Sequence, residues 1–133
     1  MYRRNKYGNK PVVVDGIRYD STGEAKRFAF LQIMERAGEL KDLRYHVKYE
    51  LVPAIVEDVV VHLKTKDKIK KQVVQKARYY EADFVYTVTS TGEEVVEDFK
   101  GQATELFLFK AALFRYMYGK SITLVKKPNE WRF

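Results

Sequence analysis

Residues 79–102 read YYEADFVYTVTSTGEEVVEDFKGQ, and this stretch decides the fold that the rest of the chain completes. Two β-forming runs, 79–88 and 95–100, flank a short connection with Gly92, which predicts an antiparallel hairpin turning at 90–92. Asp83 lies on the first run, and Asp98 and Lys100 lie on the second. Because side chains two positions apart share a face of a strand, Asp98 and Lys100 are expected to emerge together, with Asp83 one strand away.

The charges of this hairpin predict a cation site. Charged side chains are costly to bury without partners, and neighbouring carboxylates repel each other unless a cation lies between them. Mg²⁺ suits such a place because it takes oxygen ligands and often needs only one or two carboxylates plus water. A structural salt bridge of Lys100 with Asp98 or Asp83 is the commoner explanation of an isolated Asp-x-Lys tripeptide. Asp83 in hairpin register favours the metal.

Composition limits the class of protein. The 133 residues suffice for one domain with its own core, and 46% of them are hydrophobic. The formal charge of +7 favours a polyanionic partner, nucleic acid first. The chain has no cysteine, which agrees with a reducing cytoplasm, and no run apolar enough for a signal peptide or a membrane span.

The segments around the hairpin predict a mixed α+β domain. Apolar periodicity and terminal signals indicate helices from about residue 21 to 37 and from 104 to 118, each followed by a glycine. Strands are expected at 43–52, 55–63 and 121–125, and a small β-arm at 12–19. The second helix is apolar nearly all round, so it is either buried on two sides or shared with a second subunit.

Glu24 has two interpretations that the residues leave open. The spacing Ser21-x-x-Glu24 is a capping box, in which the carboxylate bonds back to the helix start. Alternatively, the Glu24 carboxylate stands over the hairpin as a third acidic group. His46 and His62 both lie in predicted strands, where a single histidine is more often a packed or surface residue than a ligand.

Two segments are expected to contact nucleic acid. Residues 1–10 form a basic tail in which Arg3, Arg4 and Lys6 alternate with tyrosines, a pattern that suits phosphate contact and is equally typical of a frayed terminus. Residues 64–78 form a basic β-ribbon or loop that would present four alternating lysines on one side, or alternatively a solvated hairpin tip. Its cationic side chains would deliver a polyanion to the acidic hairpin: Lys64, Lys66, Lys68, Lys70, Lys71 and Lys76. Lys110 of the second helix is a further candidate for phosphate contact.

The ordered set of motifs resembles the PD-(D/E)XK nuclease superfamily. The matching segments are Gly16-Ile17-Arg18-Tyr19-Asp20-Ser21 with Glu24-Ala25, then 80–86 (YEADFVY) and 95–101 (VVEDFKG). The chain looks most like the small phage and prophage endonuclease-like branch. The resemblance implies a restriction-endonuclease-like α-β-β-β-α-β core. Ala82 stands where the motif's proline would be, a change that the superfamily tolerates.

The resemblance also implies roles for individual residues. Asp83 and Asp98 would hold Mg²⁺, for which Mn²⁺ would substitute, together with the Phe99 backbone carbonyl and Glu24. Lys100 would orient the attacking water and offset transition-state charge. Gln102 would contact the scissile phosphate. Glu97 is adjacent to Asp98, but strand parity places it on the face opposite Lys100, so Asp98 is the expected ligand.

These expectations describe a metal-dependent endodeoxyribonuclease of one domain, acting in the cytoplasm of a bacterial or phage-infected cell. Branched or junction DNA is the substrate class that a phage context suggests, in DNA processing or recombination. No membrane partner is expected. A homodimer is expected because cutting two strands often needs two sites. The alternative is a non-catalytic, basic nucleic-acid-binding protein in which the same charges form structural salt bridges.

Overall fold

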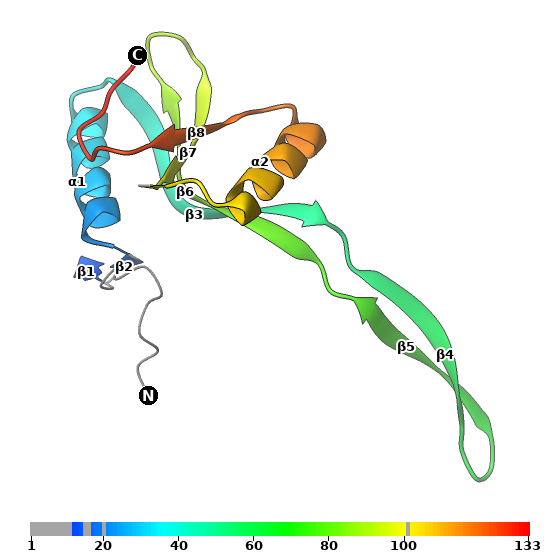
Figure 1. The fold of residues 1–133 in the computed structure, drawn as a ribbon. Helices are drawn as coiled ribbons and strands as arrows, with labels where there is room; N and C mark the ends of the chain where they lie inside the picture. Colours follow the sequence, from blue (N-terminus) through cyan, green and yellow to red (C-terminus); the bar gives the residue numbers. More distant parts are fainter. Residues whose placement is uncertain (1–11, 15–16, 20, 101) are drawn as a thin grey trace.

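The computed structural model describes residues 12–14, 17–19, 21–100 and 102–133. The basic tail with Arg3, Arg4 and Lys6, and the turn of the β-arm at residues 15–16, lie outside these residues. Along the described chain the elements are β1 (Val12–Val14), β2 (Ile17–Tyr19), α1 (Thr22–Arg36), β3 (Leu40–Val52), β4 (Ile55–His62), β5 (Asp67–Gln75), β6 (Arg78–Val88), β7 (Glu94–Phe99), α2 (Glu105–Tyr118) and β8 (Ile122–Val125) (Figure 1).

The central sheet has the strand order β3-β6-β7-β8. The β3–β6 and β6–β7 pairs are antiparallel, and β7–β8 is parallel. The return to a parallel strand requires a crossover, which α2 provides. With the β4–β5 hairpin set aside, α1, β3, β6, β7, α2 and β8 follow in the order α-β-β-β-α-β. The predicted fold class, a mixed sheet flanked by helices in a single α+β domain, is therefore confirmed.

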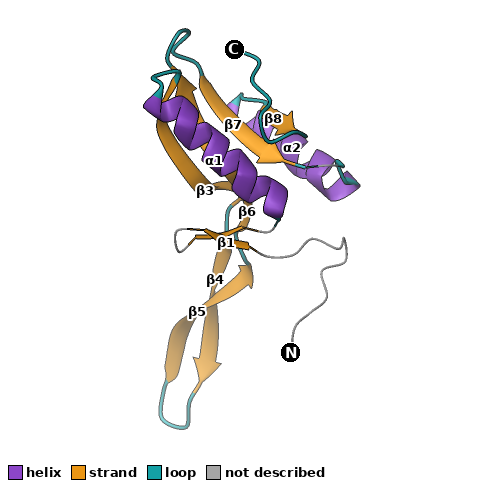
Figure 2. Cartoon of the chain, turned by 90° about the vertical axis from the view of Figure 1, so that its left-hand side faces the viewer, coloured by secondary structure: helices purple, strands orange, loops and turns teal. Residues whose placement is uncertain are grey.

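The two helices cover opposite faces of this sheet (Figure 2). Phe28 and Leu31 of α1 belong to one buried cluster together with Phe84 of β6. Phe107 and Phe114 of α2 belong to a second buried cluster on the other face. Each helix buries one stripe of side chains, as a surface helix does. The sheet is thus the middle layer of three.

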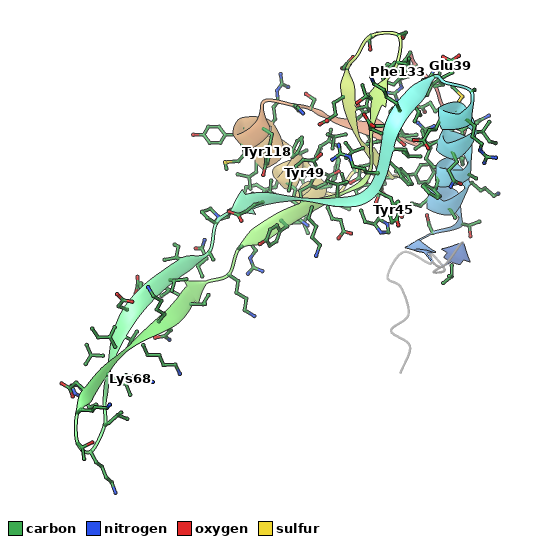
Figure 3. All side chains as sticks on the ribbon, turned by 180° about the vertical axis from the view of Figure 1, so that it is seen from behind. Glu39, Tyr45, Tyr49, Lys68, Tyr118 and Phe133 are labelled. Carbon is green, nitrogen blue, oxygen red and sulfur yellow. The ribbon has the colours of Figure 1, made fainter. Side chains whose placement is uncertain are left out.

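Strands β3 and β6 change faces in their middle. On β3, Leu43 packs on the α1 cluster whereas Val47 and Tyr49 pack on the α2 cluster, although all three positions have the same parity. His46 lies between them with φ 50°, in the left-handed region that a non-glycine residue rarely adopts. This one residue breaks the alternation, and Figure 3 shows β3 curving between Tyr45 and Tyr49. On β6, Ala82 and Phe84 are two positions apart and would share a face of a regular strand, yet they likewise belong to different clusters.

Strands β4 and β5 form a separate two-stranded ribbon that extends away from the domain (Figure 1). Val59 pairs with Lys70 and Val61 with Lys68, so these lysines share one face. Lys64 and Lys66 belong to the turn before Asp67, which is closed by the Leu63 N–H donating to the Lys66 carbonyl at 2.9 Å. The expected row of four lysines on one face is therefore wrong for the two turn residues, because the chain reverses there.

Helix α2 is less buried than its sequence predicted. Thr104 caps its start and Gly119, at φ 68°, ends it. Inside it only Phe107 and Phe114 are buried, and exposed apolar side chains include Leu106, Phe109 and Tyr116. The expectation of burial on two sides within one chain is wrong, because no further layer covers α2 among the described residues.

Candidate active site

Strands β6 and β7 separate at the two predicted aspartates. Their ladder runs from Thr87–Glu94 to Phe84–Glu97 and ends there, so Asp83 and Asp98 occupy the next position on each strand. The Asp83 Oδ2 accepts a hydrogen bond from the Phe99 backbone N–H at 2.7 Å, in place of a backbone carbonyl. A strand fork thus brings together two carboxyl groups that are fifteen positions apart in the sequence.

Asp98 is almost fully buried, with 3% of the residue exposed. Its Oδ2 accepts a hydrogen bond from the Tyr80 hydroxyl at 2.8 Å. Burial and the Asp98 charge raise the pKa of Tyr80, which keeps this hydroxyl a donor. The buried Oδ1 has no hydrogen-bond donor in the described part of the chain; the Lys100 Nζ lies 3.4 Å away as an ion pair. One oxygen of Asp98 is therefore open to a further ligand.

Asp83 is held in an environment that disfavours its charge. Burial, then the charges of Asp98 and Glu24, raise the pKa of Asp83 to about 9, against the opposing effect of the Phe99 N–H. A pKa raised by neighbouring carboxylates identifies a position where a cation would relieve repulsion. The charges of Asp98 and Glu24 therefore act on Asp83, and the role of the three residues as metal ligands stays a prediction.

Glu24 reaches this site from the first turn of α1. Ser21 caps the helix, its Oγ accepting from the Glu24 N–H at 3.1 Å, which is one half of the expected capping box. The Glu24 carboxylate is buried, and its Oε1 lies 3.0 Å from the His46 Nε2. Its carboxylate therefore faces the site while Ser21 serves the helix end.

A glycine allows α1 to approach the strand fork so closely. A Cβ on Gly23 would lie 2.5 Å from Cε1 of the Phe99 ring, closer than carbon atoms can pack. Phe99 follows Asp98 on β7, and Gly23 precedes Glu24 on α1. The contact between Gly23 and the Phe99 ring thus places the start of α1 against the strand that carries Asp98.

His46 is the residue of the site that sequence analysis missed. Tyr45 pairs with Phe84 and Val47 with Ala82, so His46 lies directly across from Asp83. Its imidazole contacts Glu24, and 29% of its side chain is exposed. A histidine in a strand is common, and nothing in the sequence marks a left-handed residue at this position.

Of the remaining predicted site residues, Lys100 and Phe99 contact the two aspartates, and Gln102 lies outside the groove. Lys100 keeps 35% of its side chain exposed, and its Nζ lies 5.1 Å from the Phe107 ring centroid, a cation–π contact. The N–H of Phe99 holds Asp83, as described above. Gln102 is exposed in the connection between β7 and α2, and it is outside the groove described below. The predicted contact of Gln102 with the scissile phosphate stays a prediction.

Glu97 is fully engaged elsewhere. It forms a bidentate salt bridge with Arg27, at 2.5 Å from Nε and 2.8 Å from Nη2, and accepts from the Tyr86 hydroxyl at 2.8 Å. Arg27 also donates to the backbone carbonyls of Pro128 and Glu130, which ties the C-terminal segment to α1. Strand parity therefore separates a structural acid, Glu97, from the site acid, Asp98.

A groove of about 760 Å³ opens beside Asp98 and Lys100, between α2 and the start of β6. Three further cationic side chains line it: Lys48, Arg78 and Lys110. Lys110 thus lies near the site, as a phosphate-contacting residue would. Of the ribbon residues expected to bind nucleic acid, Lys64, Lys66, Lys68, Lys70, Lys71 and Lys76 are all exposed.

The carboxylates have the chemistry that a hard cation needs, but the described residues do not form a complete set of ligands around one point. Asp98 offers a buried oxygen without a donor, and repulsion from Asp98 and Glu24 contributes to the raised pKa of Asp83. Yet in the described residues no three histidine, aspartate or glutamate side chains converge as a ready set of metal ligands. Protein sites for Mg²⁺ commonly use one or two carboxylates and complete the shell with water and substrate phosphate. Asp83 and Asp98 satisfy that smaller requirement.

Comparison with known proteins identifies a family. The model of a family described as "Protein of unknown function (DUF1064)" matches residues 4–130. The chain belongs to this family. A search of curated proteins and a search of solved structures each found no match. The DUF1064 match extends over all the elements described above, so the strand fork, the groove and the ribbon lie within the family's own region. No helix of the described chain has the length and apolarity to cross a membrane.

Proposed function

We propose that this DUF1064 protein is a metal-dependent endodeoxyribonuclease that hydrolyses DNA phosphodiester bonds, and that it belongs to the PD-(D/E)XK superfamily. The observation that carries the proposal is the strand fork: buried Asp98, with one oxygen lacking a donor, lies beside Lys100 and interacts with Asp83. A buried acid with an open oxygen next to a half-exposed amine is costly as pure structure, and it is suited to a cation and a phosphate.

The proposed cofactor is Mg²⁺, with Mn²⁺ as a substitute, held by Asp83, Asp98 and the Phe99 carbonyl, with Glu24 in reach. Such an ion lowers the pKa of bound water and stabilises charge on the phosphoryl group. Tyr80 fixes the orientation of Asp98 through its hydrogen bond to Oδ2. His46 in turn holds the Glu24 carboxylate at 3.0 Å. The carboxylates are thus oriented before any cation binds.

Lys100 is the residue we assign to the phosphate and the water. Its ammonium group is half-exposed at the edge of the groove, 3.4 Å from Asp98 Oδ1. A lysine presents a compact charge whose pKa shifts readily, so it can orient a water and offset negative charge as the bond breaks. Gln102 remains the proposed contact to a neighbouring phosphate oxygen.

The DNA partner is proposed from charge. The ribbon lysines and the groove cations Lys48, Arg78 and Lys110 are available to phosphates, each neutralised phosphate releasing counterions. The proposed substrates are branched or junction DNA in phage DNA processing or recombination, in the bacterial cytoplasm. We also propose a homodimer, because Leu108 and Met117 of α2, which lie outside the groove described above, have no cover among the described residues of one chain.

The test is a cleavage panel on supercoiled, linear, single-stranded and four-way-junction DNA, with Mg²⁺ or Mn²⁺ and with EDTA. We expect cleavage that requires the metal. Asp98→Asn and Lys100→Ala should each reduce it at least about 100-fold, the loss typical of removing one group that stabilises transition-state charge. Binding to DNA in EDTA should remain.

Matched controls are Asp42→Asn and Lys120→Ala. Asp42 is exposed with φ 56°, a conformation that asparagine tolerates, and Lys120 pairs with Glu94 at the surface. Both controls should cut like the parent protein. If Asp98→Asn and Lys100→Ala also cut like the parent, the assignment of the site is wrong.

A second candidate function follows from the pairing of the same groups. The Asp98–Lys100 ion pair and the Glu24–His46 contact, without three converging ligands in the described residues, would also fit a non-catalytic DNA-binding protein. That protein would bind DNA in a salt-dependent way without cleavage. Calorimetric titration with Mn²⁺ separates the two functions, because only the nuclease should bind the ion, and Asp98→Asn should abolish that binding.

A further inference from the structure

The groove beside Asp98 and Lys100 has an apolar side that phosphate contact does not use. Leu106 and Phe109 of α2 line it and are 63% and 64% exposed. Tyr79 of β6, 48% exposed, lines it from the sheet side. Large apolar side chains left in water next to a candidate active site mark a binding surface rather than a core.

Cations share this groove with the apolar groups. Lys48, Arg78, Lys100 and Lys110 line it, against the carboxylates of Glu81 and Asp98. The groove therefore combines a positive charge excess with exposed aromatic rings. Single-stranded nucleic acid is recognised by this combination, in which cations follow the backbone and bases stack on aromatic side chains. A continuous duplex keeps its bases stacked on each other and offers no base to such rings.

We infer that this groove binds an unstacked nucleotide of the DNA strand next to the phosphate at Asp98 and Lys100. Phe109 provides the surface for the base, and Arg78 and Lys110 take the adjoining phosphates. The protein then prefers DNA with an unpaired nucleotide, as at a branch, bulge or single-stranded end, over matched duplex. The inference rests on the proposed function for the identity of the polymer, and it adds the feature of that polymer which is recognised.

The test measures binding in EDTA, so that it does not depend on cleavage. Two oligonucleotide duplexes of equal length are compared, one fully matched and one with a single unpaired 2-aminopurine. We expect tighter binding of the second, by about 5- to 100-fold, the range that one base–aromatic stack supplies. The fluorescence of the 2-aminopurine should change on binding, because its stacking partners change.

Two substitutions on the same helix provide the contrast. Phe109→Ala should remove most of the preference for the unpaired nucleotide while leaving affinity for matched duplex unchanged. Tyr116→Ala is the matched control, because Tyr116 is an aromatic residue of α2 that is 86% exposed and outside the groove. Its preference should equal that of the parent protein. Both side chains are exposed, so the fold should survive either change.

The outcomes separate this inference from the proposed function. Equal affinity of the parent protein for both duplexes would overturn the inference, and so would an equal loss in Phe109→Ala and Tyr116→Ala. Absence of metal-dependent cleavage, with the preference intact, would overturn the nuclease and leave the nucleotide groove standing. Metal-dependent cleavage without a preference for the unpaired nucleotide would overturn the inference and leave the proposed nuclease standing.

Discussion

Asp83 illustrates how one residue links this site to stability. Burial first, and then the charges of Asp98 and Glu24, raise the pKa of its carboxyl to about 9, against an ordinary value of roughly 4. The native state therefore binds a proton at neutral pH that the unfolded chain has released. Stability conferred by this proton is complete below about pH 4 and is lost as the pH rises towards 9.

We predict that Asp83→Asn removes this pH dependence. In EDTA the parent protein should lose free energy of unfolding between pH 5 and pH 8. The substituted asparagine side chain carries no charge, so that variant should be more stable than the parent at pH 8, by about 1–3 kcal/mol after allowance for solvent screening. Urea denaturation at both pH values measures the difference. Asp58→Asn, a substitution at an exposed position of the ribbon, should leave the change of unfolding free energy with pH as in the parent. If Asp83→Asn also keeps the change seen in the parent, the pKa of Asp83 is not raised.

Glu97 and Asp98 are adjacent on β7, so their side chains point to opposite faces of the sheet. Glu97 points to the α1 face, where Arg27 satisfies both of its oxygens. Asp98 points to the α2 face, where only one oxygen has a hydrogen-bond donor in the described chain. An acid whose partners are complete stabilises the fold, whereas an acid with an open oxygen can bind a ligand.

At the scale of elements, the ribbon of β4 and β5 is separate from the core. Its residues are largely exposed, and Lys68 and Lys70 share a face opposite the face of Val60 and Ile69. An isolated two-stranded ribbon has little stability of its own, so its substitutions should affect binding rather than folding.

We predict that Lys68→Gln combined with Lys70→Gln weakens DNA binding without changing the free energy of unfolding. Loss of two phosphate contacts should reduce the slope of log affinity against log salt by about 1.8. Fluorescence anisotropy over a salt series measures this slope. The same double change at Lys126 and Lys127, which are exposed after β8, is the control. A slope unchanged by the ribbon variant, or changed equally by both, would show that the ribbon does not contact DNA.

At the scale of the whole molecule, two surfaces remain without cover among the described residues. α2 exposes Leu108 and Met117 outside the groove, and the ribbon exposes Val60 and Ile69. Large apolar side chains that gather on an exposed surface are typical of an interface. Two copies would also bring two strand forks to one DNA, as cutting both strands requires.

We therefore predict a homodimer at micromolar concentration. Sedimentation velocity across a dilution series should show association of the protein alone, strengthened by junction DNA. Met117→Glu on α2 should weaken it, because a charge in an apolar interface is costly to desolvate. Ile33→Glu, on the exposed side of α1, is the control. A monomer throughout the series, with and without DNA, would contradict the prediction.

Much of the fold could be predicted because its signals are local. The glycine ends of α1 and α2, the cap Ser21 and the hairpin around Gly92 depend on neighbours within a few positions. The boundaries moved modestly: β3 starts at Leu40 instead of Leu43, and the hairpin loop extends over residues 89–93. Parity along β7 was also enough to separate Glu97 from Asp98, since alternation holds in a regular strand.

The sequence by itself determined the order of elements, the basic surface, and the acids that could meet. Only the tertiary structure decided which of them do. The bend at His46, the contact of Gly23 with Phe99 and the partnership of Arg27 with Glu97, seventy residues apart, all depend on packing between distant segments. Periodicity reports which face of an element a residue occupies. It carries no information on where two strands separate, and here that separation forms the site.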